Sequence, residues 1–414
     1  MKRLLAPLAA AAACLALASC QSSQQPAPVQ PSKLVDDVKP AVKAPPTDLE
    51  QLAERLVRQS AGVKEGESVL ITGGAENMEL LEDIAVQVRK AGGFPLIAVG
   101  SDRLAKRMYA DVPEKYDAQT DQLDLKLAGI VNAVITVGRT TDEKLFADAD
   151  PKRMAARAKA NEAIPEEYDK HNVRTVEVGN GLYPQEWLAP RYGMTTEELA
   201  KTFWGGVNID YTDLQARGAQ VSAALAAGSE LHITDPAGTD LKVKVQGRAY
   251  GVSDGIISAE DVKKGPAGLN VYLPAGEVYT TPVPGTAEGK VVLKKEYFNG
   301  QEINDLTLTF AAGKLTGITG SGPGFERMKA VYDAAGEGKD LFAVVDFGIN
   351  PNVKLPANSQ LATWVPAGTV TVGVGNNSWA GGDNKTPYGY FVSLPGTTVT
   401  LDGKTVVEAG QLKL

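Results

Sequence analysis

The stretch EGESVLITGGAENMELLEDIAVQVRKAGGFPLIAVG, residues 65–100, holds two short apolar runs separated by a longer mixed run. VLITGG, which ends in glycines, is typical of a buried strand. AENMELLEDIAVQVRK is typical of a helix, and Gly92-Gly93 ends it. PLIAVG then predicts a second strand. A strand, a helix and a strand in this order favour a parallel sheet covered by helices.

The same alternation continues on both sides of this stretch. Leu49, Leu52, Leu56 and Val57 form one apolar helical stripe before it. After it we predict a helix at 101–112 and strands at 132–138 and 175–181. VLITGGAENM contains neither a spaced G-x-G-x-x-G motif nor a P-loop lysine, so a tight turn explains its glycines better than a nucleotide site.

The character of the chain changes after a helical stretch over residues 195–227, which opens with a capping box from Thr195 to Glu198. ELHITDPAGTDLKVKVQGR, residues 230–248, alternates apolar and polar residues around a turn and predicts a hairpin. Many further strand-like runs follow, interrupted by one clear helix, GFERMKAVYDAAG. The predicted fold is therefore an N-terminal parallel-sheet α/β domain, residues 48–225, followed by a strand-rich α+β domain, residues 226–414.

The N-terminus has the pattern of a bacterial lipoprotein signal over residues 1–19. Lys2 and Arg3 precede an alanine-rich apolar run that ends in Leu-Ala-Ser-Cys at Cys20. The pattern predicts cleavage before Cys20 and acylation of this residue; an ordinary secretory signal with a chance cysteine is the alternative. Gln21 stands where an aspartate would retain a lipoprotein at the inner membrane. We therefore predict a lipid anchor in the outer membrane, facing the periplasm.

Residues 20–47 contain six prolines and no apolar periodicity, which predicts an extended tether. The net charge is −8 at pH 7, and the basic residues are scattered among acidic ones, so nucleic acid is not an expected partner. The two cysteines both lie at positions 14 and 20, which leaves none in the folded part for a disulfide, a metal site or a nucleophile. The chain also lacks the G-x-S-x-G motif of many serine hydrolases.

Several further motifs follow one another in a fixed order: LPAGEVYTTP at 273–282, FGINPN at 347–352, GVGNN at 373–377 and TVTLDGKTVVEAG at 398–410. In this order they resemble the metalloaminopeptidases of the thermophilic type, the aminopeptidase T and aminopeptidase S family. A non-haem iron 2,5-dihydroxypyridine dioxygenase uses the same fold. The resemblance covers nearly all of the folded part and implies a homodimer, because family members are typically dimers.

The resemblance implies two metal ions in the second domain, held by carboxylates, histidines and a tyrosine, which activate a water molecule. The two family glutamates fall on Glu277 and Asp346. The other family ligands are replaced: a histidine by Thr371, the tyrosine by Ser378, and the H-x-D pair by Tyr388 and Tyr390. The chain has two histidines, His171 and His232, and the sequence around each indicates a surface or hairpin position.

Two carboxylates alone do not hold a pair of zinc ions, which require three or four strong ligands each. Together with waters, carbonyls and Asp383, they could hold one hard cation such as magnesium or calcium. The resemblance thus implies either a divalent metal (zinc, cobalt, manganese or magnesium) at Glu277 and Asp346 or no metal at all.

Three functions are compatible with these observations. The favoured one is a catalytically impaired aminopeptidase-like lipoprotein that binds peptides or small ligands in the former metal-site cleft, beside Trp379, Tyr388 and Tyr390. The same aromatic residues could equally be ordinary strand residues. The alternative is an active metal-dependent aminopeptidase with a rearranged site, in which the catalytic candidates are Glu277, Asp346, Tyr388 and Tyr390. Iron-dependent ring cleavage is disfavoured, because it requires two histidine ligands.

Overall fold

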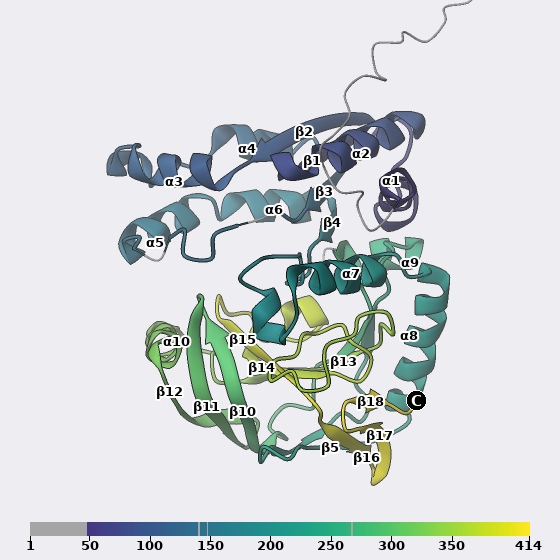
Figure 1. The fold of residues 1–414 in the computed structure, drawn as a ribbon, viewed down its shortest axis with the longest axis vertical. Coiled ribbons are helices and arrows are strands. Elements are labelled where there is room, and N and C mark those ends of the chain that lie inside the picture. Colours follow the sequence, from purple (N-terminus) through teal and green to yellow (C-terminus); the bar gives the residue numbers. More distant parts are fainter. Residues whose placement is uncertain (1–47, 140, 147, 266–267) are drawn as a thin grey trace, which may run out of the picture. The chain divides into compact units, whose positions relative to one another are not determined.

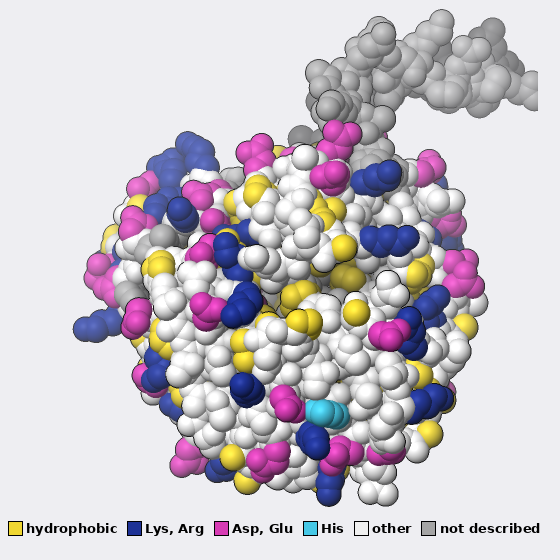
Figure 2. Space-filling model, turned by 60° about the horizontal axis from the view of Figure 1, so that its bottom comes forward, with side chains coloured by type: hydrophobic (Ala, Val, Ile, Leu, Met, Phe, Trp, Pro, Cys, Tyr) yellow, Lys and Arg dark blue, Asp and Glu magenta, His cyan; other side chains and the backbone are white. Residues whose placement is uncertain are grey.

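The computed structural model describes residues 48–139, 141–146, 148–265 and 268–414, and these form three β-sheets (Figure 1). The predicted signal, the tether and Cys20 lie outside the described residues. Among the helices that are described, none is long and apolar enough to cross a membrane. The described residues belong to one compact unit, so the predicted boundary near residue 226 stays a prediction. Basic and acidic side chains are interspersed on the face drawn in Figure 2.

The first sheet has five parallel strands in the order β2-β1-β3-β4-β8, which confirms the parallel sheet predicted from residues 65–100. Its strands are β1 Ser68–Gly74, β2 Phe94–Gly100, β3 Ala133–Val137, β4 Arg174–Val178 and β8 Asn270–Leu273. Strand β8 comes from the second half of the chain and extends the sheet beside β4. The sheet is therefore built from both halves of the sequence.

Helices α1 (Leu49–Arg55) and α2 (Met78–Lys90) pack together and supply apolar side chains to this part of the core. Leu52 of α1 and Leu81 and Ile84 of α2 are fully buried. Burial of these stripes follows from their helical periodicity, and each such side chain contributes about 2 kcal/mol.

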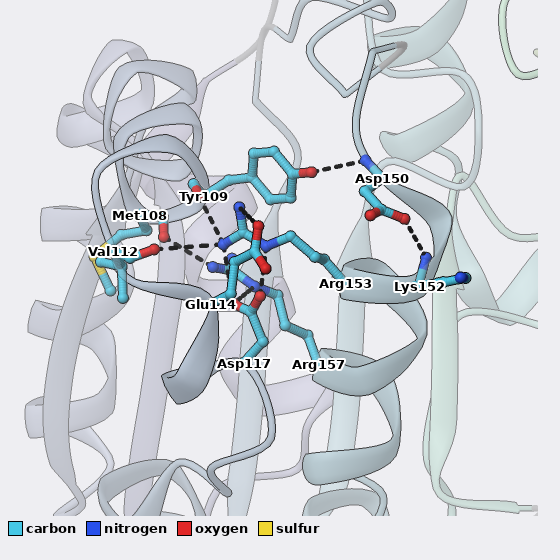
Figure 3. A network of polar contacts seen from close by, with 9 residues as sticks. All are labelled: Met108, Tyr109, Val112, Glu114, Asp117, Asp150, Lys152, Arg153 and Arg157. Atoms are coloured by element: carbon cyan, nitrogen blue, oxygen red, sulfur yellow. Dashed lines mark hydrogen bonds and ion pairs between the residues drawn. The ribbon is translucent and has the colours of Figure 1, made fainter.

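Four more helices belong to this part of the chain, of which only the first was predicted. Their bounds are α3 Asp102–Ala110, α4 Gln122–Ala128, α5 Pro151–Ala160 and α6 Ala163–Lys170. A polar network ties α3 and α5 together (Figure 3). The buried carboxylate of Asp117 accepts from Arg153 Nε at 2.5 Å and from Arg157 Nε at 2.6 Å. Both guanidinium groups also stack on the Tyr109 ring, 4.4 and 5.2 Å from its centroid.

The helical stretch predicted over 195–227 is two helices, α7 Thr196–Val207 and α8 Tyr211–Ala226. The predicted capping box is present: Glu198 N donates to Thr195 Oγ1 at 3.2 Å, and Thr195 N donates to Glu198 Oε2 at 2.8 Å. The second helix begins after Asp210, whose side chain accepts from the backbone of its first turn. A second N-cap inside the stretch therefore divides it.

The second half forms two antiparallel sheets, as predicted for a strand-rich domain. One has the order β12-β11-β10-β6-β5-β16-β17-β18, and the other β15-β14-β13-β9-β7. The predicted hairpin is β5 and β6. The strands are β5 Glu230–Thr234, β6 Asp240–Lys244, β7 Tyr250–Ser253, β9 Glu277–Thr280, β10 Glu288–Phe298, β11 Gln301–Ala311, β12 Lys314–Ser321, β13 Phe342–Gly348, β14 Val370–Gly375, β15 Gly389–Leu394, β16 Thr398–Leu401, β17 Lys404–Glu408 and β18 Gln411–Leu412. The helices are α9 Ala259–Lys263 and α10 Pro323–Ala334.

The segment between β8 and β9 carries the chain from the parallel sheet into the five-stranded antiparallel sheet. It contains a cis peptide bond before Pro274, and Gly276 has φ of 128°. The fully buried Asn350 side chain donates to Ala275 O at 2.7 Å and to Gly206 O at 3.1 Å. The bond to Ala275 joins two of the recognised motifs. It holds the backbone just before Glu277, where β9 begins.

Gly276 should tolerate no side chain. An added Cβ would lie 2.7 Å from Asn350 Cβ and 2.9 Å from its backbone nitrogen, at a φ that favours glycine. We expect Gly276→Ala to lower the free energy of unfolding by about 3 kcal/mol. Gly381→Ala is the matched control, because Gly381 also has a positive φ, 79°, but has nothing within 4 Å of an added Cβ; it should cost about 1 kcal/mol. Equal losses in chemical denaturation would contradict the proposed close contact.

Candidate functional site

Glu277 and Asp346 lie on adjacent strands of the five-stranded antiparallel sheet. Glu277 is opposite Gly348, and Asp346 is opposite Tyr279. Side chains two residues apart on a strand point to the same face, so Glu277, Tyr279 and Asp346 share one face of the sheet. Glu277 is 8% exposed and Asp346 1%. The structure therefore brings the two predicted carboxylates together in a buried environment.

Asn180 connects Glu277 to the parallel sheet. It follows the carboxyl end of β4 in a left-handed conformation with φ of 41°. Its side-chain amide donates to Pro274 O at 2.9 Å and to Glu277 Oε1 at 3.3 Å. Ligands of parallel sheets bind beyond the carboxyl ends of the strands, and this is where Glu277 lies.

The Asp346 side chain has neighbours on both sides, but within the described part of the chain its carboxylate has no hydrogen-bond partner. Tyr279 of β9 and Thr371 of β14 flank it in the cross-strand row. The hydroxyl of Thr371 instead pairs with that of Ser393, at 2.7 Å. Neither carboxylate oxygen of Asp346 has a hydrogen-bond partner among the residues that the structure describes, although both oxygens are buried. A buried carboxylate without partners is costly unless a proton or a cation accompanies it.

Both carboxyl groups have raised pKa values. Burial raises the pKa of Asp346 well above its ordinary value, and the nearby charge of Glu277 raises it further. Burial likewise raises the pKa of Glu277 from 4.5 to about 7, against the lowering effect of hydrogen bonds from Asn180 and Ser253. This favours a pair that retains a proton near neutral pH.

An aromatic cluster of Tyr279, Trp364, Trp379 and Phe391 lies beside the pair. The Trp379 ring centroid is 5.3 Å from that of Tyr279 and 5.9 Å from that of Phe391, and Trp364 lies 5.5 Å from Phe391. Tyr279 belongs both to this cluster and to the row containing Asp346. Burial, and then the Asp346 charge, raise the pKa of Tyr279 to about 12, so it remains a neutral phenol. Trp379, which was predicted to line a ligand pocket, thus contacts Tyr279 on the carboxylate face; the pocket itself stays a prediction.

Tyr388 and Tyr390 are not brought to the carboxylate pair. Tyr390 is opposite Val374 on β14, whereas Ser393 is opposite Thr371, so alternation directs Tyr390 to the other face of the sheet. There its ring lies 6.3 Å from Phe298, and the Tyr388 ring lies 5.7 Å from Tyr332.

The β15 residues on the carboxylate face are Phe391 and Ser393, which were not predicted as site residues. A one-residue difference in register moves every side chain of a strand to the opposite face, and the sequence of β15 alone does not fix that choice. The prediction that Tyr388 or Tyr390 acts together with Glu277 and Asp346 is therefore not supported by the geometry.

The remaining predicted positions are accounted for separately. Thr371 lies beside Asp346, as the resemblance implies, but the Ser378 hydroxyl donates to Asn376 at 2.8 Å. Asp383 is exposed and lines a cavity at the other end of β13, so it does not assist the pair. The two histidines pair with acidic residues elsewhere: His171 with Glu167 and His232 with Asp240, each at 2.8 Å.

The donor groups on this face do not fit a pair of zinc or cobalt ions. Among the described residues they are two carboxylates and the hydroxyl groups of Ser253, Thr371, Ser393 and Tyr279, with no nitrogen ligand. Within the described part of the chain, nowhere do three or more His, Cys, Asp or Glu residues gather as a metal-binding group. Oxygen donors alone suit a single hard cation, which needs waters to complete its coordination.

Comparison with known proteins identifies similar sequences and folds. A family model described as thermophilic metalloprotease (M29) matches residues 46–331. No curated protein sequence matches the chain. Wild-type AmpT from Thermus thermophilus has a similar fold, with a TM-score of 0.66 at 18% identity over 88% of this chain and 99% of AmpT. A 2,5-dihydroxypyridine dioxygenase from Pseudomonas putida has a TM-score of 0.53 at 16% identity, over 88% and 96% of the two chains.

The raised pKa of Glu277 predicts a pH-dependent stability. The folded state binds more protons than the unfolded state between the ordinary value of 4.5 and the folded value of about 7. Glu277 alone should therefore lower stability by about 3 kcal/mol as pH rises through this window, and the raised pKa of Asp346 adds to the fall. We expect Glu277→Gln to remove a large part of this fall and to raise the melting temperature at pH 8.

Glu186→Gln is the control, since Glu186 is exposed in a loop. Its melting temperature should follow that of the unmodified protein at every pH. If Glu277→Gln also followed the unmodified protein between pH 4.5 and 8, the carboxyl pair would not be desolvated as described.

Proposed function

The chain belongs to the thermophilic metalloprotease (M29) family, and from this premise we propose that it is a catalytically impaired, aminopeptidase-like protein that binds peptides or other small ligands beside Glu277 and Asp346. The observation that carries this proposal is the identity of the residues facing Asp346. Beside Asp346, β14 presents Thr371 where the resemblance implies a histidine. The β15 side chains on this face are Phe391 and Ser393, whereas Tyr388 and Tyr390, which occupy the implied H-x-D positions, do not reach the pair.

These replacements remove the nitrogen ligands that a pair of transition-metal ions needs. The family model matches residues 46–331, which include Glu277 but not Asp346.

Ligand binding is supported by the groups that remain. The pair is acidic, and the adjacent aromatic cluster includes Trp379, which is 37% exposed. An acidic pair beside aromatic rings favours a positively charged group, because carboxylates and ring faces both attract cations. The amino group of a peptide or another small amine has this chemistry.

A second candidate is an active metal-dependent aminopeptidase with a rearranged site. The specific observation in its favour is that both oxygens of Asp346 are buried without a partner, as a cation ligand would be before its cation binds. Glu277 and Asp346 would hold one hard cation, which would polarise a peptide carbonyl. Besides the Asn180 amide, the described residues around the pair supply hydroxyl groups to assist it.

The location of the protein is proposed from its N-terminal sequence. We propose a lipid anchor on Cys20 in the outer membrane, facing the periplasm, and, from the family resemblance, a homodimer. Labelling with radioactive palmitate should disappear in Cys20→Ser; label that persists in this variant would contradict the anchor.

Peptide hydrolysis distinguishes the two candidates. The purified protein should release no N-terminal residue from short peptides after incubation with zinc, cobalt, manganese or magnesium, because no residue beside Glu277 and Asp346 supplies a nitrogen ligand. Released amino acids can be measured by chromatography. Hydrolysis that is retained in Glu186→Ala but abolished in Glu277→Ala would overturn the proposal and support the rearranged metal site.

A further inference from the structure

A cavity of about 220 Å³ lies at the N-terminal end of β13, away from Asp346. Phe342, at the start of β13, lines it, whereas Asp346 is four residues further along the same strand. The turn that follows β9 and the loop over residues 377–384 form other parts of its wall. This cavity is therefore separate from the carboxylate pair, although the same strands build both.

Arg248 lines the cavity and is held in place by one residue. Its Nε donates to Thr281 O at 2.8 Å, and its Nη2 donates to Thr281 Oγ1. Thr281 is 3% exposed and follows β9 directly, so this anchor is rigid. The two contacts occupy one edge of the guanidinium group.

The other edge of the Arg248 guanidinium, formed by Nη1 and Nη2, carries the donors that remain. Among the described residues, no carboxylate lies within ion-pair distance of Arg248, and Nη1 contacts no acceptor. Two parallel N–H donors on one edge match the two oxygens of a carboxylate. Because Thr281 already fixes the side chain, little conformational entropy would be lost on binding.

The rest of the wall indicates which anion fits. Pro282, Val283, Leu341 and Phe342 make much of it apolar. The amides of the loop are engaged within the fold: Asn384 Nδ2 donates to Gly338 O at 2.8 Å and to Gly375 O at 2.7 Å. One cation and one exposed acid, Asp383, line the cavity. This balance suits a singly charged anion with an apolar body better than a phosphate dianion.

We propose that this cavity binds the carboxylate group of a small organic acid, held by the free edge of Arg248, with its apolar part against Pro282 and Phe342. The site does not depend on the proposed function, because it contains neither Glu277 nor Asp346. It would give the protein a recognition point for a carboxylate at a fixed distance from the acidic pair.

Calorimetric titration of the full-length protein in detergent tests the site with two probes, N-acetylalanine and its neutral amide. The acid should bind and the amide should bind at least roughly tenfold more weakly, because only the acid offers two charged oxygens to Arg248. Arg248→Gln should weaken binding of the acid by a similar factor. Arg103→Gln is the control, since Arg103 is exposed on α3, and should leave binding unchanged.

Misfolding of Arg248→Gln would also abolish binding, so a second variant tests the site by a gain of affinity. Asp383→Asn removes the acid at the cavity and should tighten binding of N-acetylalanine about two- to threefold at low salt. Equal binding of acid and amide, or no binding of the acid at millimolar concentration, would overturn the proposal. So would unchanged affinity in a folded Arg248→Gln variant. None of these outcomes depends on whether the protein hydrolyses peptides.

Discussion

Two carboxyl groups buried on one face of a sheet cost free energy unless a proton or a cation accompanies them, and the site of this protein depends on that constraint. The side chain of Asn180, beyond the carboxyl end of β4, donates to Glu277. The β8–β9 segment that precedes Glu277 is held by a hydrogen bond from the Asn350 side chain to Ala275 O. Asp346 has no such partner. The fold therefore holds two acids side by side, although among the described residues no group of three or more His, Cys, Asp or Glu forms around them.

The residues beside the two carboxyl groups explain how the fold accommodates the buried pair. The positions of β14 and β15 that face Asp346 carry hydroxyl groups and an aromatic ring, and Tyr279 and Trp379 pack over the same face. Aromatic packing contributes to stability here, while burial lifts the pKa values of the acids and so reduces their charge. Arg248 lines a separate cavity at the other end of β13, together with the acidic Asp383.

The sequence alone was sufficient to predict the fold where a local pattern of residues determines the structure. Residues 65–100 predicted the parallel sheet, and the recognised motifs contain Glu277 and Asp346, which the structure places on neighbouring strands. Helices α4 to α6 were not predicted; α5 makes contacts that are distant in sequence, such as that of Arg153 with Asp117, which a local pattern does not show. Tyr388 and Tyr390 were predicted from the positions of the implied H-x-D pair, and the sequence alone does not show which face of the sheet they occupy. Asn180 and Tyr279 were not singled out, since their relation to the pair exists only after the sheets assemble.

The central claim is that this family member lacks a transition-metal pair because its nitrogen ligands have been replaced. Elemental analysis of the purified protein, after incubation with zinc, cobalt or manganese and extensive dialysis, tests it most directly. The account predicts far less than one equivalent of metal per chain, with no difference between the unmodified protein and Glu277→Ala. One or two equivalents that are retained through dialysis and lost in Glu277→Ala would contradict it.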